Sequence, residues 1–169
     1  MPFNPEVVRQ VDSVLRHRSQ IVQILVKHDL YQAPASEIDI HELRKHGDRY
    51  FIHSPLLGKM KSADGVYIFV IRSWEPWRIV CAKIGSVGGH TSLSREHRNG
   101  RQFVGSVHFA GEMIFERGHL IAWNNGSGHY RPESNLERTN VLPYINHMLP
   151  IGLFRSNGSA GRTFGYANG

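Results

Sequence analysis

The feature that most constrains the fold is a succession of strand-like apolar runs in the middle of the chain. VYIFVIRSW (66–74) and RIVCAKIGS (78–86) are rich in β-branched and aromatic residues and are joined by the turn-like tetrapeptide WEPW. SVHFAGEMIF (106–115) and HLIAWNN (119–125) are joined by a second turn. Strand-like runs with such short connections are typical of β-hairpins, so the sequence predicts a hairpin-built antiparallel sheet.

An amphipathic segment precedes these hairpins at residues 4–28. Asn4 can cap a helix there, and Pro5 suits the first turn, where its missing N–H is not needed. Valine and leucine residues then recur at helical spacing and form one apolar face. The pattern predicts an N-terminal helix whose apolar face packs on the sheet of the same chain, with a partner as the other possible docking surface.

Shorter elements are expected between the helix and the end of the second hairpin. Residues 40–47 read as a short element that Ser36 or Asp39 could cap. RYFIHSPL (49–56) reads as a short strand that ends at a proline. Residues 90–103 are expected to be a polar connection with an Asn-Gly turn.

The sequence after the second hairpin predicts one more helix, followed by a tail. Pro132 can open a helix through ESNLERTNVLPYINHML that is interrupted or ends near Pro143. Residues 151–169 are rich in Gly, Ser and Asn and read as a loosely attached tail. The predicted fold is therefore α+β: a single domain over residues 1–150, with an N-terminal helix on the sheet and a short helix after it.

Composition narrows the classes of function. The net charge is +6 and the pI about 9.8, which favours nucleic acid, acidic protein surfaces or phosphate-bearing ligands as partners. The single Cys81 allows no internal disulfide and no multi-cysteine zinc site. No apolar run has the length of a membrane span, and the start MPFNPEVVRQ lacks the apolar segment of a Sec signal.

A series of short motifs resembles a known module. They are the triplet His90-Thr91-Ser92, the small motif Phe109-Ala110-Gly111, the turn Arg117-Gly118 and the segment Ser127–Pro132, which reads SGHYRP. Together they resemble the His-Ser-Ser … Ser-Gly-His-Tyr-x-Pro module of bacterial toxin and effector C-terminal domains and of plant calmodulin-binding proteins with an IQ motif. No IQ motif is visible here, so the bacterial side of the resemblance fits better.

The resemblance implies a bacterial toxin or secreted effector. Such a protein is expected in the bacterial cytoplasm before a specialised system delivers it to the cytoplasm of a target cell. An immunity protein or a chaperone is the implied partner, besides nucleic acid or NAD as a ligand. No membrane span and no bound cofactor are expected, and NAD enters only as a substrate.

Histidine is the natural general acid or base near neutral pH, and two histidines can share both roles. If the elements before His90 and His129 end on the same side of the sheet, both imidazoles can face one cleft. Ser92, two residues after His90, is expected to point to the same side of an extended chain. These three residues are the candidate catalytic group, for RNA cleavage without metal or for chemistry on NAD.

Five further residues are candidates for substrate contacts. The loop after the second hairpin can supply backbone N–H groups and a guanidinium for phosphate, and a tyrosine ring that could stack on a base or on nicotinamide. A carboxylate, from Glu112, follows the small motif directly. These candidates are Ser127, Gly128, Tyr130, Arg131 and Glu112.

Two alternatives remain open on the sequence alone. The segment Glu116–Leu120 (ERGHL) resembles the Asp-Arg-Gly-His motif of ββα-metal non-specific nucleases, with His119 as the base and Asn140 as a candidate metal-site residue for a divalent ion. The other alternative is an effector without enzymatic activity that uses its basic surface to bind a host protein.

Overall fold

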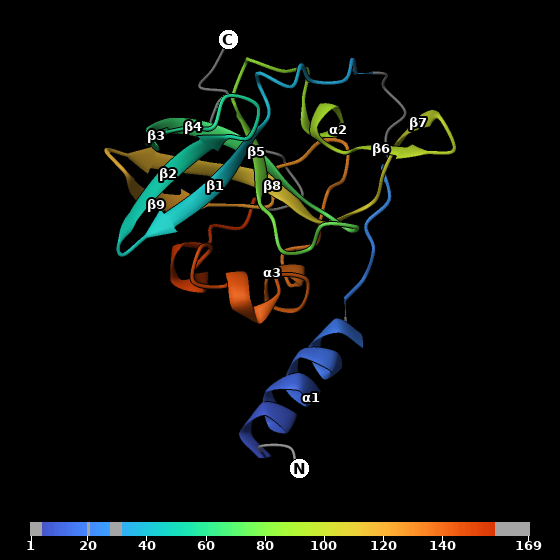
Figure 1. Ribbon diagram of the computed structural model, residues 1–169, viewed down its shortest axis with the longest axis vertical. Coiled ribbons are helices and arrows are strands. Elements are labelled where there is room, and N and C mark those ends of the chain that lie inside the picture. Colours follow the sequence, from blue (N-terminus) through green and yellow to red (C-terminus); the bar gives the residue numbers. More distant parts are fainter. Residues whose placement is uncertain (1–4, 20, 28–31, 158–169) are drawn as a thin grey trace.

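Seven strands form one antiparallel sheet that runs through the body of the protein. The structure is a computed structural model that describes residues 5–19, 21–27 and 32–157. The strand order is β3-β2-β1-β5-β4-β8-β9 (Figure 1). The strands of this sheet are β1 (His41–His46), β2 (Arg49–Ser54), β3 (Lys59–Ser62), β4 (Gly65–Arg72), β5 (Val80–Lys83), β8 (Val107–Glu116) and β9 (His119–Trp123).

Both hairpins predicted from the sequence are confirmed, and so is the α+β class. β4 pairs with β5 and β8 pairs with β9, in each case antiparallel. Arg117 and Gly118, in the β8–β9 turn, have φ angles of 47° and 83°, as a tight hairpin turn requires. β4 also pairs with β8 over its whole length and so joins the two hairpins into one sheet.

Each face of the sheet carries its own apolar core. Because side chains alternate along a strand, Phe109 and Ala110 of β8 belong to different cores. The larger core packs Phe109 and Trp123 against C-terminal residues such as Leu149. The smaller core packs Ala110 against the short helix α2 (His90–Leu93) and Tyr130, and we call this side the α2 face.

The capped element predicted at residues 40–47 is a strand. This segment forms β1, which lies between β2 and β5, so the caps predicted at Ser36 and Asp39 are wrong. The alternation of HELRKH puts Leu43 into the larger core, and pairing on both sides overrides any helical preference. The strand predicted at RYFIHSPL is confirmed as β2.

The connection at residues 90–103 holds more structure than predicted. It contains α2 and a small separate hairpin, β6 (Arg95–Arg98) and β7 (Arg101–Val104). The Asn-Gly turn is confirmed between these strands, where Asn99 and Gly100 have φ angles of 50° and 72°. The β6–β7 hairpin projects from the side of the main sheet (Figure 1).

The helix predicted after Pro132 is reduced to single turns. α3 (Leu136–Thr139) is followed by the 3₁₀ turns η1 (Pro143–Ile145) and η2 (Ile151–Leu153). Phe154 bridges Trp123 of β9, so the fold extends past the tail boundary predicted at residue 150. The remainder of that tail, residues 158–169, lies outside the described residues.

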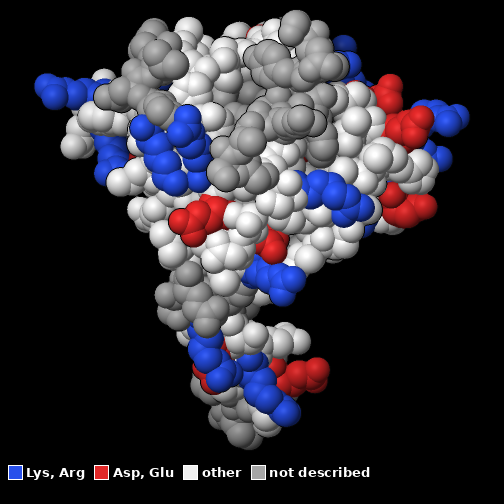
Figure 2. All heavy atoms as spheres, turned by 180° about the vertical axis from the view of Figure 1, so that it is seen from behind, with Lys and Arg blue, Asp and Glu red and all other residues white. Residues whose placement is uncertain are grey.

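The prediction that the N-terminal helix packs on the sheet is wrong. α1 (Pro5–Ser19) ends well before residue 28 and stands away from the body (Figures 1 and 2). Its apolar residues Val8, Val11 and Leu15 are exposed, because other elements already cover both faces of the sheet. None of the helices in the described parts of the chain combines the length and the apolar character that crossing a membrane requires.

Two leucine-to-alanine substitutions test the position of α1. Leu15 is 56% exposed and Leu43 is 2% exposed. We expect Leu15→Ala to change the free energy of unfolding by less than about 0.5 kcal/mol. Leu43→Ala is expected to lower it by about 2–5 kcal/mol, because it removes buried methyl groups and leaves a cavity. Urea denaturation measures both, and a comparable loss for Leu15→Ala would show that α1 is packed after all.

Candidate active site

The candidate site is built around Gly111, where β8 passes the end of β9 at very close range. A Cβ atom at Gly111 would lie 1.8 Å from the backbone oxygen of Asn124, so a larger residue fits only if the backbone moves. Asn124 donates its backbone N–H to Glu112 O and accepts the Glu112 N–H with its side-chain oxygen, each at 2.9 Å. Asn124 therefore completes the ladder with its own side chain and ends the hairpin at the site.

His90 lies at the start of α2 and contacts the same stretch of β8. Its Nε2 is 2.8 Å from the carbonyl oxygen of Gly111, and the side chain is buried. Because a carbonyl oxygen only accepts, Nε2 carries the proton and Nδ1 of the neutral ring is the basic nitrogen. Burial lowers the pKa of His90 from 6.5 to about 4; the bond to Gly111 partly opposes this, and His129 lowers it further.

His129 comes to the same region from the loop after β9. Its charge acts on the pKa of His90, so the two imidazoles lie within electrostatic range of each other. The loop is held in place through its backbone: Lys27 N–H donates to His129 O at 2.7 Å, and Arg131 N–H donates to Ser127 O at 2.8 Å. Of the three candidate catalytic residues, His90 and His129 interact electrostatically, and their catalytic roles stay predictions.

Glu112 lies on the α2 face beside Gly111. It alternates along β8 with Met113, which belongs to the larger core, and its side chain is buried. The carboxylate oxygen Oε1 accepts a hydrogen bond from the Asn124 amide at 3.2 Å. A Cβ at Gly126 would lie 2.7 Å from the same oxygen, so this glycine lets the loop pass close to the carboxylate.

Ser92 does not join this group. The prediction assumes an extended chain, whereas residues 90–93 form α2, in which side chains two positions apart point in different directions. Ser92 Oγ is buried, has no hydrogen-bond partner among the described residues, and would lie 3.1 Å from a Cβ at Gly88. It faces the loop before α2, so the extended chain that the prediction assumed is wrong, and a catalytic role for Ser92 stays a prediction.

Tyr130 anchors the loop in the core instead of presenting its ring to a ligand. It is fully buried, and its hydroxyl contacts Ser94 Oγ and donates to Gly105 O at 2.8 Å. Ser127 is also buried, and its Oγ accepts the Tyr130 N–H at 3.3 Å. Both side chains therefore shape the turn that carries His129.

Gly128 and Arg131 are the exposed members of the loop. A Cβ at Gly128 would meet no atom within 4 Å, so this position opens towards solvent. Arg131 has a φ angle of 43°, and its Nε donates to Gly128 O at 3.1 Å. Their roles as ligand contacts remain predictions.

The residues of the metal-nuclease alternative lie far apart. His119 is paired with Glu116, at the last position of β8, whereas Asn140 donates to the oxygen of His108, near its first position. The strand rise puts these positions roughly 25 Å apart. The Asn140 amide also accepts the backbone N–H of Val22 and donates to Val22 O. Within the described ranges, no group of three or more His, Cys, Asp or Glu side chains is arranged to hold a metal ion.

Sequence reasoning misses three amide side chains that hold the site in place. Besides Asn124, Asn125 donates to Pro132 O at 2.8 Å and accepts the N–H of Asn157 at 2.9 Å. Gln32 donates to Gly88 O at 2.6 Å and accepts from Thr91 Oγ1 at 2.5 Å. The Asn-Asn pair directly after a predicted strand is a signal that could have identified the first two, while Gln32 has none.

The low pKa of His90 makes stability depend on pH. Between pH 6.5 and 4 the unfolded state binds a proton at His90 that the folded state does not, so stability falls as pH falls. Over this range the free energy of unfolding falls by about 3 kcal/mol through His90 alone. Urea denaturation from pH 7 to pH 4 should therefore show a steeper loss for the wild type than for His90→Gln, which cannot titrate. Parallel curves would contradict the low pKa.

When the chain is compared with known proteins, no family model, curated protein or solved structure matches it. The resemblance to the toxin and effector module therefore rests on the quoted motifs. What supports a function here is the arrangement itself: His90 is buried and held by Gly111 O, His129 acts on it electrostatically, and the next residue of β8, Glu112, is buried on the α2 face.

Proposed function

We propose that this chain is a toxin- or effector-like enzyme that cleaves RNA without a metal, with His90 and His129 as its acid–base pair. The observation that carries the proposal is the placement of His90, a buried ring held by Gly111 O and within electrostatic range of His129. His90 is kept neutral by burial, and each charged ring disfavours charge on the other. The pair therefore binds its first proton more readily than its second. With one proton bound, one ring is the acid and the other the base, as a single displacement needs.

The chemistry assigns one role to each ring. His90 Nδ1 takes the proton of the ribose 2′-hydroxyl while the 2′-oxygen attacks the adjacent phosphorus. The bond from phosphorus to the 5′-oxygen breaks, and this oxygen takes a proton from the charged His129. The products are a 2′,3′-cyclic phosphate and a free 5′-hydroxyl. Bound phosphate favours the charged form of both rings and so raises the basicity of His90 in the complex.

The charge of the chain supports an anionic substrate. The formal net charge is +6, and on the face seen in Figure 2 Lys and Arg side chains are spread among Asp and Glu. Such a distribution favours polyanions in general. The setting we propose, a target-cell cytoplasm with an immunity protein or chaperone as partner, follows from the resemblance to the toxin and effector module.

Glu112 supports a second candidate, chemistry on NAD. Its buried carboxylate lies on the same face as the histidine pair and accepts a hydrogen bond from Asn124. A carboxylate held in this way can stabilise the positive charge that develops on a ribose when nicotinamide leaves. In this candidate, loss of nicotinamide release in Glu112→Gln is the diagnostic result.

RNA cleavage in EDTA tests the proposal directly. We expect the wild type to cut a single-stranded RNA oligomer, to leave a 2′,3′-cyclic phosphate, and to spare DNA of the same sequence. His129→Gln should lower the rate about 10²–10⁴-fold, because it removes the general acid. His119→Gln is the matched control, since this histidine lies at the far end of the β8–β9 hairpin.

Other outcomes of this experiment would favour a different function for the protein. Cleavage that needs a divalent ion and is lost in His119→Gln would contradict the proposal and favour the nuclease alternative. RNA left intact by folded wild type, with NAD consumed, would favour the Glu112 candidate. If neither substrate reacts, an effector that binds a host protein becomes the better account.

A further inference from the structure

An open groove lies between the β6–β7 hairpin and the extended segment at residues 23–25. Its volume is about 670 Å³, and its walls come from both strands of the hairpin and from residues 104–106. Ile24 exchanges backbone hydrogen bonds with Val107 at 2.8 and 3.0 Å, which fixes this segment beside the base of the hairpin. The groove therefore has two anchored walls.

The groove exposes apolar side chains from both walls. Phe103 of β7 is 48% exposed and Leu25 of the facing segment is 67% exposed. An exposed aromatic ring beside an aliphatic side chain in a groove is suited to stacking on a planar ligand. Neither side chain belongs to the two cores, so both are available to a ligand.

The rim of the groove is cationic. Arg98 and Arg101 face each other across the β6–β7 pair. Arg98 forms a two-pronged ion pair with Glu96, at 2.6 and 2.9 Å, whereas Arg101 makes no ion pair with a described residue. The glutamate is thus neutralised within the hairpin, and the charge of Arg101 is left for an anionic ligand.

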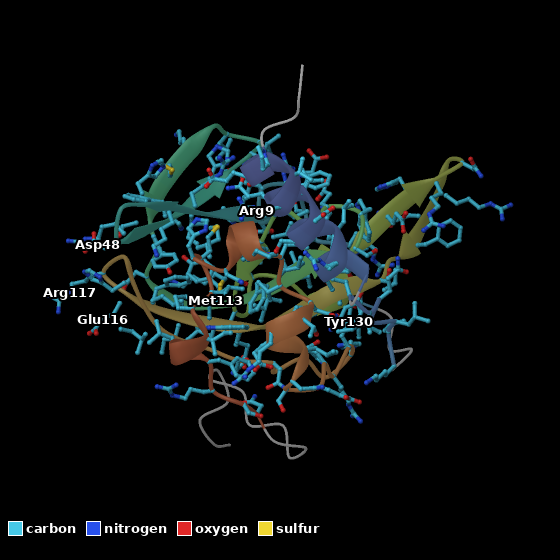
Figure 3. The ribbon with its side chains drawn as sticks, turned by 90° about the horizontal axis from the view of Figure 1, so that it is seen from below. Arg9, Asp48, Met113, Glu116, Arg117 and Tyr130 are labelled. Carbon is cyan, nitrogen blue, oxygen red and sulfur yellow. The ribbon has the colours of Figure 1, made fainter. Side chains whose placement is uncertain are left out.

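The groove adjoins the candidate active site. Gly105, in the groove wall, accepts the hydroxyl of Tyr130, the neighbour of His129. Two residues after Leu25, Lys27 donates its N–H to His129 O and its ammonium group to Arg131 O at 3.0 Å. Two residues of extended chain span ~7 Å, so the groove opens close to the loop that carries His129. In Figure 3, Tyr130 lies on the side from which the hairpin projects.

We propose that this groove binds single-stranded RNA, with a base stacked on Phe103, its phosphate at Arg101, and the strand leading past Lys27 to His129. Proteins that bind single strands without sequence preference combine aromatic side chains, on which bases stack, with basic side chains that contact the phosphates. The inference rests on the proposed function for the fate of the strand, whereas the binding step depends on the groove alone. It names the substrate of the histidine pair as an unpaired strand rather than a duplex.

Fluorescence anisotropy with a labelled 2′-O-methyl RNA oligomer tests binding apart from cleavage, because this strand cannot react. Phe103→Ala should weaken binding at least about fivefold. Arg101→Gln should reduce the slope of log Kd against log salt by about 0.7, the value for one lost phosphate contact on a single strand. Arg117→Gln is the matched control with the same loss of charge at the opposite end of the sheet, and it should leave that slope unchanged.

The outcomes separate this inference from the proposed function. Wild-type binding that Phe103→Ala and Arg101→Gln weaken supports the groove, even if unmodified RNA is never cut; that result would overturn only the proposed catalysis. If the wild type cleaves RNA but neither variant weakens binding, the groove is not the RNA-binding site. No binding of the oligomer by folded wild type, or capture of an acidic protein by the same residues, would also overturn it. Thermal unfolding checks that the variants fold.

Discussion

The close approach of β8 and the end of β9 at Gly111 is the constraint on which the site depends. The space of a side chain at this position is occupied by the backbone oxygen of Asn124. Because the two backbones meet there, Asn124 can bond both backbone groups of Glu112, and the loop leaves the sheet at that point. The same glycine presents its own carbonyl oxygen to His90. One residue without a side chain thus sets the positions of a strand end, a carboxylate and an imidazole.

The chemistry of the site follows from burial imposed by that arrangement. His90, the first residue of α2, is buried and hydrogen-bonded through Nε2, so its neutral form is favoured and its basic nitrogen is Nδ1. His129 arrives on a loop held by Tyr130 in the core and by Lys27 along its backbone. A buried ring held by a carbonyl oxygen and a second ring on a separately anchored loop have different surroundings. That asymmetry, rather than the presence of two histidines, supports acid–base catalysis.

Strand-like runs joined by short turns made both hairpins of the main sheet predictable. The Arg117-Gly118 turn specifies the β8–β9 hairpin, whereas the Asn99-Gly100 turn belongs to a separate hairpin in a stretch predicted only as a polar connection. Burial is not local, so the exposure of α1 and the strand at residues 41–46 depend on which elements cover or flank the sheet. A motif likewise gives residue types without directions. His129 acts electrostatically on His90, while the helical turn at 90–93 points Ser92 towards the loop before α2.

The proposed catalysis depends on the protonation state of His90 beside His129, and nitrogen-15 NMR of the histidine rings measures that state. The account predicts that at pH 7 the His90 ring is neutral with its proton on Nε2, and that it titrates near 4 rather than 6.5. In His129→Gln the pKa of His90 should rise, because the repelling charge is gone. A proton on Nδ1, titration near 6.5, or no response to His129→Gln would contradict the account.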